Sequence, residues 1–205
     1  MAKRNIDIKQ RGSQTKVIKS VYLIVPEGKN QTETVYLSHF QEQGKEYRIE
    51  FVKAGSSTDA ESLYKALLNR WKEEGLSVKK GDKGFVVIDI DNDKKKAEKA
   101  KKLIAMNKNS AIDFIVSNPT FEVWFLLHFK DTARAFPNGK SVIRELRKFI
   151  PNYQKNVDCY DICKSKLENA IENASKNEKR FEGEEWPSVE CNPRTDMKRL
   201  MGILK

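Results

Sequence analysis

The sequence contains no apolar run of about 18 residues, which is the length that a helix needs to cross a bilayer. The first residues are basic, but they lack the apolar stretch of a secretory signal peptide. Cysteine is scarce: the chain has 3, and so small and odd a set argues against a disulfide-bonded secreted scaffold. We therefore expect a cytoplasmic protein without a membrane-spanning segment.

Several familiar site motifs are also absent. The segment Asp89–Asp93 resembles the start of an EF-hand loop, but Lys94 stands where that loop needs glycine and Ala100 where it needs glutamate. The triplet Gly139–Ser141 resembles the end of a P-loop, but Arg134 stands where the upstream glycine is required. The cysteines have no matching histidine or fourth cysteine, so a zinc site is not indicated. The chain should not bind ATP through a P-loop.

Positive charge is plentiful and unevenly distributed. The chain has 39 Lys and Arg against 29 Asp and Glu, a net charge of +10, and half of this excess lies within residues 1–20. A basic arm over residues 1–19 indicates either a polyanionic partner such as nucleic acid or simply a solubilising terminal segment. In the first case, Arg4, Lys9 and Arg11 would contact the phosphate backbone.

Short apolar runs alternate with helical patterns over residues 20–130. Each of four segments has the composition of a buried strand: Val21–Val25, Tyr47–Val52, Phe85–Ile88 and Ile112–Val116. Helical spacing occupies the intervening segments, over 33–43, 58–75 and 94–106. This alternation predicts an α/β fold, a parallel sheet of about four strands with helices on both faces.

The remaining residues, 131–205, show no further strand pattern beyond Pro137 and look helical over 139–150, 158–176 and 193–204. We expect them to form a helical C-terminal region packed on the α/β domain.

Two sequence signals predict where helices begin. Thr58 with Glu61 forms a capping box, and Asn118 followed by Pro119 offers an N-cap and a first helical residue. After Pro119, apolar residues and His128 recur at helical spacing on one face, which favours a core histidine over a functional one.

Acidic residues follow the ends of three predicted strands. Glu27 follows the first strand, Asp89 and Asp91 follow the third, and Glu122 begins the helix after the fourth. The carboxyl ends of parallel strands share one edge of a sheet, where ligand sites of α/β proteins lie. Clustered carboxylates repel unless a cation balances them, and ligands made only of oxygen suit Mg²⁺ or Mn²⁺. The alternative is that these are solvated loop acids.

The i, i+2 spacing of Asp89 and Asp91 predicts that both point to one side of an extended segment. Glu33 and Glu122 have a second interpretation, because a carboxylate in the first turn of a helix is stabilised by the helix dipole alone. Lysines follow these acids directly, among them Lys94, Lys95, Lys96 and Lys99. They indicate either a phosphate-binding rim or a solvated helix face.

At these residues the chain resembles TOPRIM domains, which carry Glu-Gly after the first strand and Asp-x-Asp after the third. Within that fold it resembles the RloB-like family, through Val25–Gly28, Ile88–Asp91, the block Ser117–Phe129 and the late Asn192–Thr195. The resemblance implies a bacterial protein of restriction and abortive-infection loci, a metal-dependent nuclease encoded beside an ATPase.

The resemblance also implies that Glu27, Asp89 and Asp91 hold the metal, with Asp93, Glu122 and Glu33 as further candidates. Between Glu27 and Glu33 the chain is one residue longer than the family pattern, which makes Glu33 the weakest of these candidates.

The leading hypothesis is therefore a Mg²⁺- or Mn²⁺-dependent nuclease of DNA or RNA that works with a separate ATPase partner. Glu27 would act as general acid or base or as a shared ligand, and Asp89 and Asp91 would anchor the metal. One alternative is a non-catalytic module that binds nucleic acid or the ATPase through a degenerate site. A small-molecule phosphohydrolase is a third.

Overall fold

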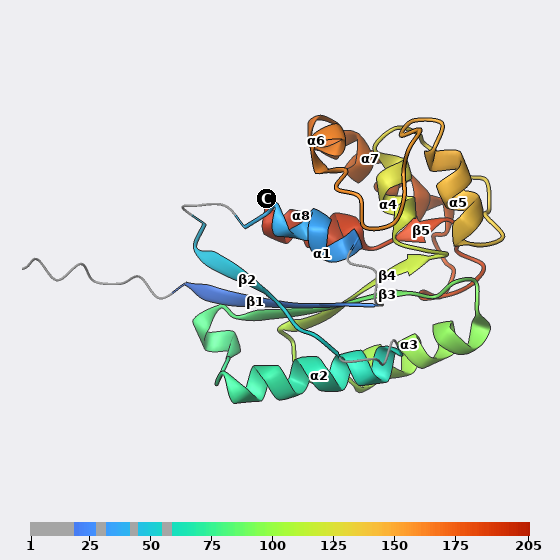
Figure 1. The fold of residues 1–205 in the computed structure, drawn as a ribbon. Coiled ribbons are helices and arrows are strands. Elements are labelled where there is room, and N and C mark those ends of the chain that lie inside the picture. The colour runs from blue at the N-terminus through green and yellow to red at the C-terminus, as the bar shows by residue number, and fades with distance from the viewer. Residues whose placement is uncertain (1–18, 28–31, 42–44, 55–58) are drawn as a thin grey trace, which may run out of the picture.

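A computed structural model of the chain describes residues 19–27, 32–41, 45–54 and 59–205, and shows a sheet covered by helices on both faces (Figure 1). The strand order is β2-β1-β3-β4-β5. The parallel α/β sheet predicted from the sequence is confirmed. Its parallel strands are β1 (Ser20–Pro26), β2 (Tyr47–Phe51), β3 (Lys83–Asp89) and β4 (Ile112–Asn118).

The central strands form because their β-branched and aromatic residues are buried on both faces of the sheet. Residues 84–88 of β3 are all buried between the two helical layers. Gly84 allows one of these layers to approach, because a Cβ there would come within 2.9 Å of Leu67 Cδ2 and 3.1 Å of Ile112 Cγ1. The absence of a side chain at Gly84 therefore determines how closely the neighbouring helix packs on the sheet.

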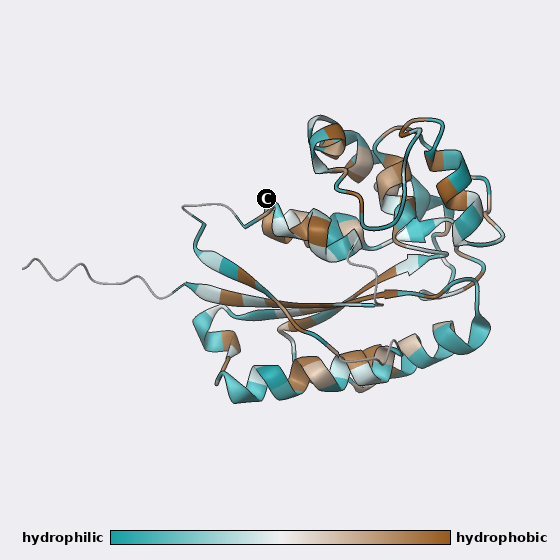
Figure 2. Cartoon of the chain, in the orientation of Figure 1, coloured by the Kyte–Doolittle hydropathy of each residue, from teal (hydrophilic) through white to brown (hydrophobic). Residues whose placement is uncertain are grey.

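One face of the sheet is covered by α2 (Ala60–Glu73) and α3 (Lys94–Met106) (Figure 1). Their polar outer faces and apolar inner faces are visible in Figure 2, and the buried positions of α3 include Ala97 and Ala100. The N-cap of α2 is Asp59, whose carboxylate accepts a hydrogen bond from the Ser62 amide. The predicted capping residue Thr58 lies outside the described residues.

The other face is covered by α1 and by the helices after β4, whose side chains share one hydrophobic core with the sheet (Figure 1). The largest buried side chain in this layer is Trp124. The elements are α1 (Thr32–Ser38), α4 (Glu122–Leu127), α5 (Gly139–Leu146), α6 (Tyr160–Cys163), α7 (Leu167–Arg180) and α8 (Met197–Leu204), with the 3₁₀ turn η2 (Lys164–Lys166). A second 3₁₀ turn, η1 (Val78–Lys80), connects α2 to β3.

His128 lies inside this layer, with 1% of its surface exposed. Its Nδ1 donates a hydrogen bond to the Trp124 carbonyl, and burial lowers the pKa of the imidazole to about 4. The expectation of a core histidine is confirmed.

Two expectations about local structure are wrong. Asn118 does not cap a helix; it ends β4, and α4 begins only at Glu122. The Asn118 amide is occupied elsewhere, donating to the carbonyls of Ser188 and Cys191 and accepting from the Asn92 amide. The C-terminal region also contains a strand: β5 (Arg194–Thr195) pairs antiparallel with β4 where a helix was expected to begin.

In the described parts of the chain, no helix is both long and apolar enough to cross a membrane.

Packing between α2 and the sheet predicts a large stability effect at Leu67, whose side chain is fully buried. We expect Leu67→Ala to lower the free energy of unfolding by about 2–5 kcal/mol, because it removes buried apolar contacts and leaves a cavity. Urea denaturation followed by circular dichroism measures this. The matched control Lys72→Ala, at an exposed position of the same helix, should change stability by less than about 0.5 kcal/mol; equal losses would contradict the packing described.

Candidate functional site

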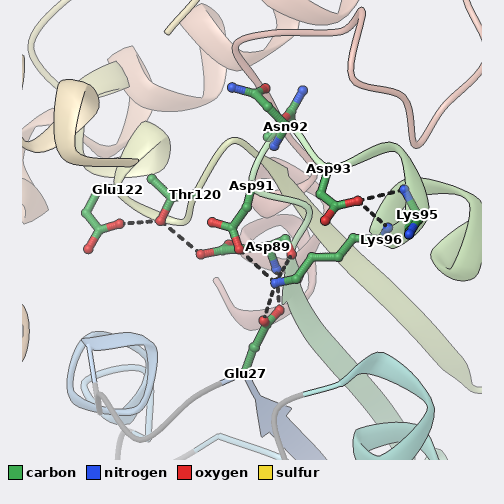
Figure 3. Close-up of polar contacts among 10 residues, drawn as sticks. Glu27, Asp89, Asp91, Asn92, Asp93, Lys95, Lys96, Thr120 and Glu122 are labelled. Carbon is green, nitrogen blue, oxygen red and sulfur yellow. Dashed lines mark hydrogen bonds and ion pairs between the residues drawn. The ribbon is translucent and has the colours of Figure 1, made fainter. Parts of the chain in front are cut away.

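Acidic side chains gather at the carboxyl edge of the parallel sheet (Figure 3). Glu27 follows β1 and is held to β3 by two hydrogen bonds. Its amide donates to the Val87 carbonyl at 2.9 Å, and its Oε2 accepts from the Asp89 amide at 2.9 Å. Glu27 and Asp89 therefore lie together because β1 and β3 are neighbours, as their positions at strand ends predicted.

A tight turn after β3 presents Asp91. Asp91 and Asn92 have φ values of 51° and 58°, a left-handed conformation that Asp and Asn tolerate better than most residues. The Asn92 side chain donates to the Phe136 carbonyl at 2.7 Å and accepts from Asn192 at 2.7 Å, so the C-terminal region holds this turn. The predicted extended segment is therefore wrong: Asp91 reaches the site from a turn.

The Lys96 ammonium lies between Glu27 and Asp91 (Figure 3). Its Nζ is 2.8 Å from Glu27 Oε1 and 2.7 Å from Asp91 Oδ2. Burial lowers the pKa of Lys96, but the hydrogen bonds to Asp91 and Glu27 outweigh that effect and raise it overall. Lys96 is four residues before the buried Ala100, so helical spacing places it on the face of α3 that meets the sheet. A lysine of the predicted rim thus offsets part of the negative charge of these acids.

A second group of acids lies deeper, around Thr120. Thr120 Oγ1 is 2.9 Å from Asp89 Oδ2 and 2.6 Å from Glu122 Oε2. A hydroxyl has one hydrogen to donate, so both contacts are favourable only when one of the two carboxyl groups carries a proton. The other oxygen of Glu122, which is 1% exposed, accepts from the Tyr153 hydroxyl at 3.2 Å and lies 3.5 Å from Lys155 Nζ.

Burial and neighbouring negative charge raise the pKa of two acids here, Asp89 and Glu33. Burial raises the pKa of Asp89 well above its ordinary value, and the nearby charges of Glu33, Glu122 and Glu27 raise it further. Burial also raises the pKa of Glu33 to about 7, and Glu122 adds to the shift. Glu33 Oε2 is buried and has no hydrogen-bond partner among the described residues.

The donor chemistry of this edge fits a hard divalent cation. The donors are carboxylate oxygens, their mutual repulsion is only partly relieved, and one buried oxygen of Glu33 lacks a partner in the described part of the chain. Within those residues, no three acidic, histidine or cysteine side chains are grouped closely enough to form a metal site as they stand. A metal held by Glu27 and Asp91 would have to take the place of the Lys96 ammonium.

The structure places the other predicted site residues as follows. Asp93 caps α3, its Oδ1 accepting from the Lys95 amide at 2.7 Å, which directs it away from the other acids. Lys99 pairs with Asp59 at 2.8 Å, while Lys94 and Lys95 are exposed. The arm residues lie outside the described residues: Arg4, Lys9 and Arg11.

Sequence reasoning missed Thr120, Tyr153 and Lys155. Thr120 stands two residues before Glu122, a signal that a search for carboxylates alone passes over. Tyr153 and Lys155 belong to a loop between α5 and α6 that follows no motif, and only the fold brings them to Glu122.

The raised pKa of Glu33 predicts an acid-favouring contribution to stability. Its folded-state pKa of about 7 exceeds the ordinary 4.5, so the folded state binds the proton more tightly than the unfolded state. Stability therefore falls as pH rises from about 4.5 through about 7. In EDTA, we expect Glu33→Gln to stabilise the fold at pH 8 by up to about 3 kcal/mol and so to raise the melting temperature. At pH 4, the substitution should change the melting temperature little.

The exposed variant Glu182→Gln is the control and should shift melting equally at both pH values. If Glu33→Gln shifts the melting temperature relative to wild type no more at pH 8 than at pH 4, the raised pKa of the buried Glu33 is contradicted.

Comparison with known proteins identifies the family. No curated protein and no solved structure matches the chain. The model of a family described as RloB-like protein matches residues 22–204, a span that includes the whole acidic edge and the C-terminal helices packed beside it. The chain therefore belongs to the RloB-like protein family.

Proposed function

We propose that this chain is a divalent-metal-dependent nuclease that hydrolyses phosphodiester bonds of DNA or RNA. The observation that carries the proposal is the convergence of Glu27, Asp89 and Asp91 on one edge of the sheet, with Glu33 and Glu122 directly behind them. Acids concentrated in this way are costly without a cation, and phosphoryl transfer is the chemistry that such a bound dication serves.

In this proposal, Glu27, Asp89 and Asp91 hold Mg²⁺ or Mn²⁺, and Glu33 and Glu122 add negative charge from the deeper layer. The bound metal supplies charge neutralisation at the phosphate and a lowered pKa for a coordinated water. Thr120 orients the Asp89 carboxylate by its contact at 2.9 Å. Lys96, released from Glu27 and Asp91, supplies a positive charge beside the reacting phosphate.

We further propose that the enzyme acts in the cytoplasm, in bacterial defence against phage by abortive infection, with a separate ATPase as partner. This part rests on the RloB-like family and its association with restriction loci. The sequence supports the division of labour, since Gly139–Ser141 lacks the upstream glycine of a P-loop.

A second candidate is a non-catalytic module that binds nucleic acid or the ATPase. The position of Lys96 favours it, because an ammonium at 2.8 Å from Glu27 and 2.7 Å from Asp91 already satisfies both carboxylates. A site permanently filled by its own lysine would need no metal.

Nuclease activity is the direct test. Purified protein is incubated with plasmid, single-stranded DNA and tRNA in Mg²⁺ or Mn²⁺, alone and with the ATPase encoded beside it. We expect cleavage by wild type and a loss of at least about 100-fold in Asp89→Asn/Asp91→Asn, since the metal ligands are removed. Product formation on gels measures this.

The matched control is Asp113→Asn, an exposed aspartate at the other end of the sheet, on β4, which should cut as wild type does. Equal behaviour of wild type and the double variant on every substrate would contradict the catalytic proposal.

Metal binding separates the two candidates without any substrate. If the acids bind Mg²⁺ in the folded state only, the melting temperature should rise with Mg²⁺ concentration. At 100 times the dissociation constant, the bound metal adds about 2.7 kcal/mol to the free energy of unfolding. Asp89→Asn/Asp91→Asn should abolish the rise, and Asp113→Asn should retain it. No Mg²⁺-dependent shift in wild type, with none for Mn²⁺, would favour the non-catalytic module.

A further inference from the structure

A cleft of about 410 Å³ opens beside the acidic edge, on the side of the C-terminal region. Asp91 and Thr120 form the wall that it shares with the acids, and α5 together with the loop after it forms the rest. Its size is within the range of about 300–1,000 Å³ that ligand sites occupy. The remaining lining residues are Asn138, Gly139, Lys140, Ile143 and Lys155.

The cleft carries positive charge, in contrast to the neighbouring acidic edge. Lys140 is exposed and makes no ion pair with any described residue. Lys155 lies 3.5 Å from Glu122, and 42% of its side chain is exposed. The one acid of the lining, Asp91, is already paired with Lys96. The cleft therefore favours an anion.

The cleft is also held in place by the fold. Gly139 lies against Thr120, since a Cβ there would come within 3.2 Å of Thr120 Cγ2, so the start of α5 packs on the residue that contacts Asp89. The loop that carries Lys155 is anchored on both sides, by the Tyr153 hydroxyl on Glu122 and by the Asn156 amide on Thr32 Oγ1 at 3.0 Å. The backbone segments that carry both lysines are thus held in place relative to the acids.

Three lysines of α3 are less suited to this role because they pair with acids of the protein. Lys96 pairs with two acids of the site, Lys99 pairs with Asp59 at 2.8 Å, and Lys101 pairs with Glu185 at 2.7 Å. The charge of these three lysines is largely neutralised within the protein, whereas Lys94 and Lys95 are exposed. The C-terminal region adds positive charge on the cleft side of Asp91, through Lys140 and Lys155.

We propose that Lys140 and Lys155 hold the phosphate backbone of a polynucleotide strand in this cleft, next to the phosphate that lies at the acidic edge. The inference rests on the proposed function, because it assumes a phosphodiester substrate there. Asp91 lines the cleft and contacts Lys96, so the cleft adjoins the acidic edge. Lys140 and Lys155 are binding residues, and they bear on affinity and strand position.

The test measures binding without cleavage. Fluorescence anisotropy of labelled single-stranded DNA and single-stranded RNA is recorded in EDTA over a series of salt concentrations, with the full chain. We expect Lys140→Gln/Lys155→Gln to weaken binding about tenfold and to reduce the slope of log K against log salt by about 1.4, the value for two lost phosphate contacts. Tighter binding of single-stranded DNA or of single-stranded RNA shows which of the two polymers the cleft prefers.

The matched control is Lys79→Gln/Lys108→Gln, which removes two exposed lysines at the amino edge of the sheet, one in η1 and one in the loop after α3. It should bind within twofold of wild type. Equal weakening in the two double variants, or unchanged affinity in the cleft variant, overturns the inference. Because Lys155 contacts Glu122, thermal melting checks folding, and Lys140→Glu alone tests the cleft at a residue with no described ion pair.

Cleavage assays keep this inference distinct from the proposed function. If wild type cuts no substrate but the cleft variant still loses affinity, the binding cleft is supported and the nuclease proposal is contradicted. If wild type cuts its substrate and the cleft variant has an unchanged KM, the binding cleft is contradicted and the nuclease proposal is supported.

Discussion

Mutual repulsion among buried carboxylates is the constraint on which the rest of this structure depends. Parallel strands end at one edge of the sheet, and the residues that follow them here are acids. Burial and neighbouring charge raise the pKa values of Asp89 and Glu33, so the folded chain bears an electrostatic cost at this edge. That cost is opposed by the hydrophobic layers that hold the strands together on both faces of the sheet.

The repulsion is relieved differently in two places. Near the surface, Lys96 of α3 bonds to Glu27 and Asp91 and offsets part of their negative charge. Deeper in, Thr120, Tyr153 and Lys155 contact the buried acids with hydroxyl groups and one partly exposed ammonium. The first arrangement is an ion pair that a metal could replace, whereas the second is built into the packing of the C-terminal region.

The C-terminal region is therefore part of the site as well as of the core. Asn192 holds the turn that carries Asp91, and the loop after α5 brings Tyr153 and Lys155 to Glu122. The cleft beside Asp91 exists because Gly139 lets α5 pack against Thr120. If this chain cuts nucleic acid, the residues at the ends of the β-strands supply the catalytic groups and the helical C-terminal region supplies residues that bind the substrate.

The sequence by itself determined the parallel α/β sheet and the place of the acids, because apolar strand runs and the residues after them can be read along the chain. It also indicated a core His128. Only the tertiary structure decided that Lys96 faces inward, that Asp91 sits in a left-handed turn, and that Asn118 ends a strand instead of capping a helix. β5 and the contacts of Tyr153 and Lys155 were likewise invisible in the sequence. Each depends on groups from distant segments meeting across the sheet edge, and local sequence pattern carries no information about such partners.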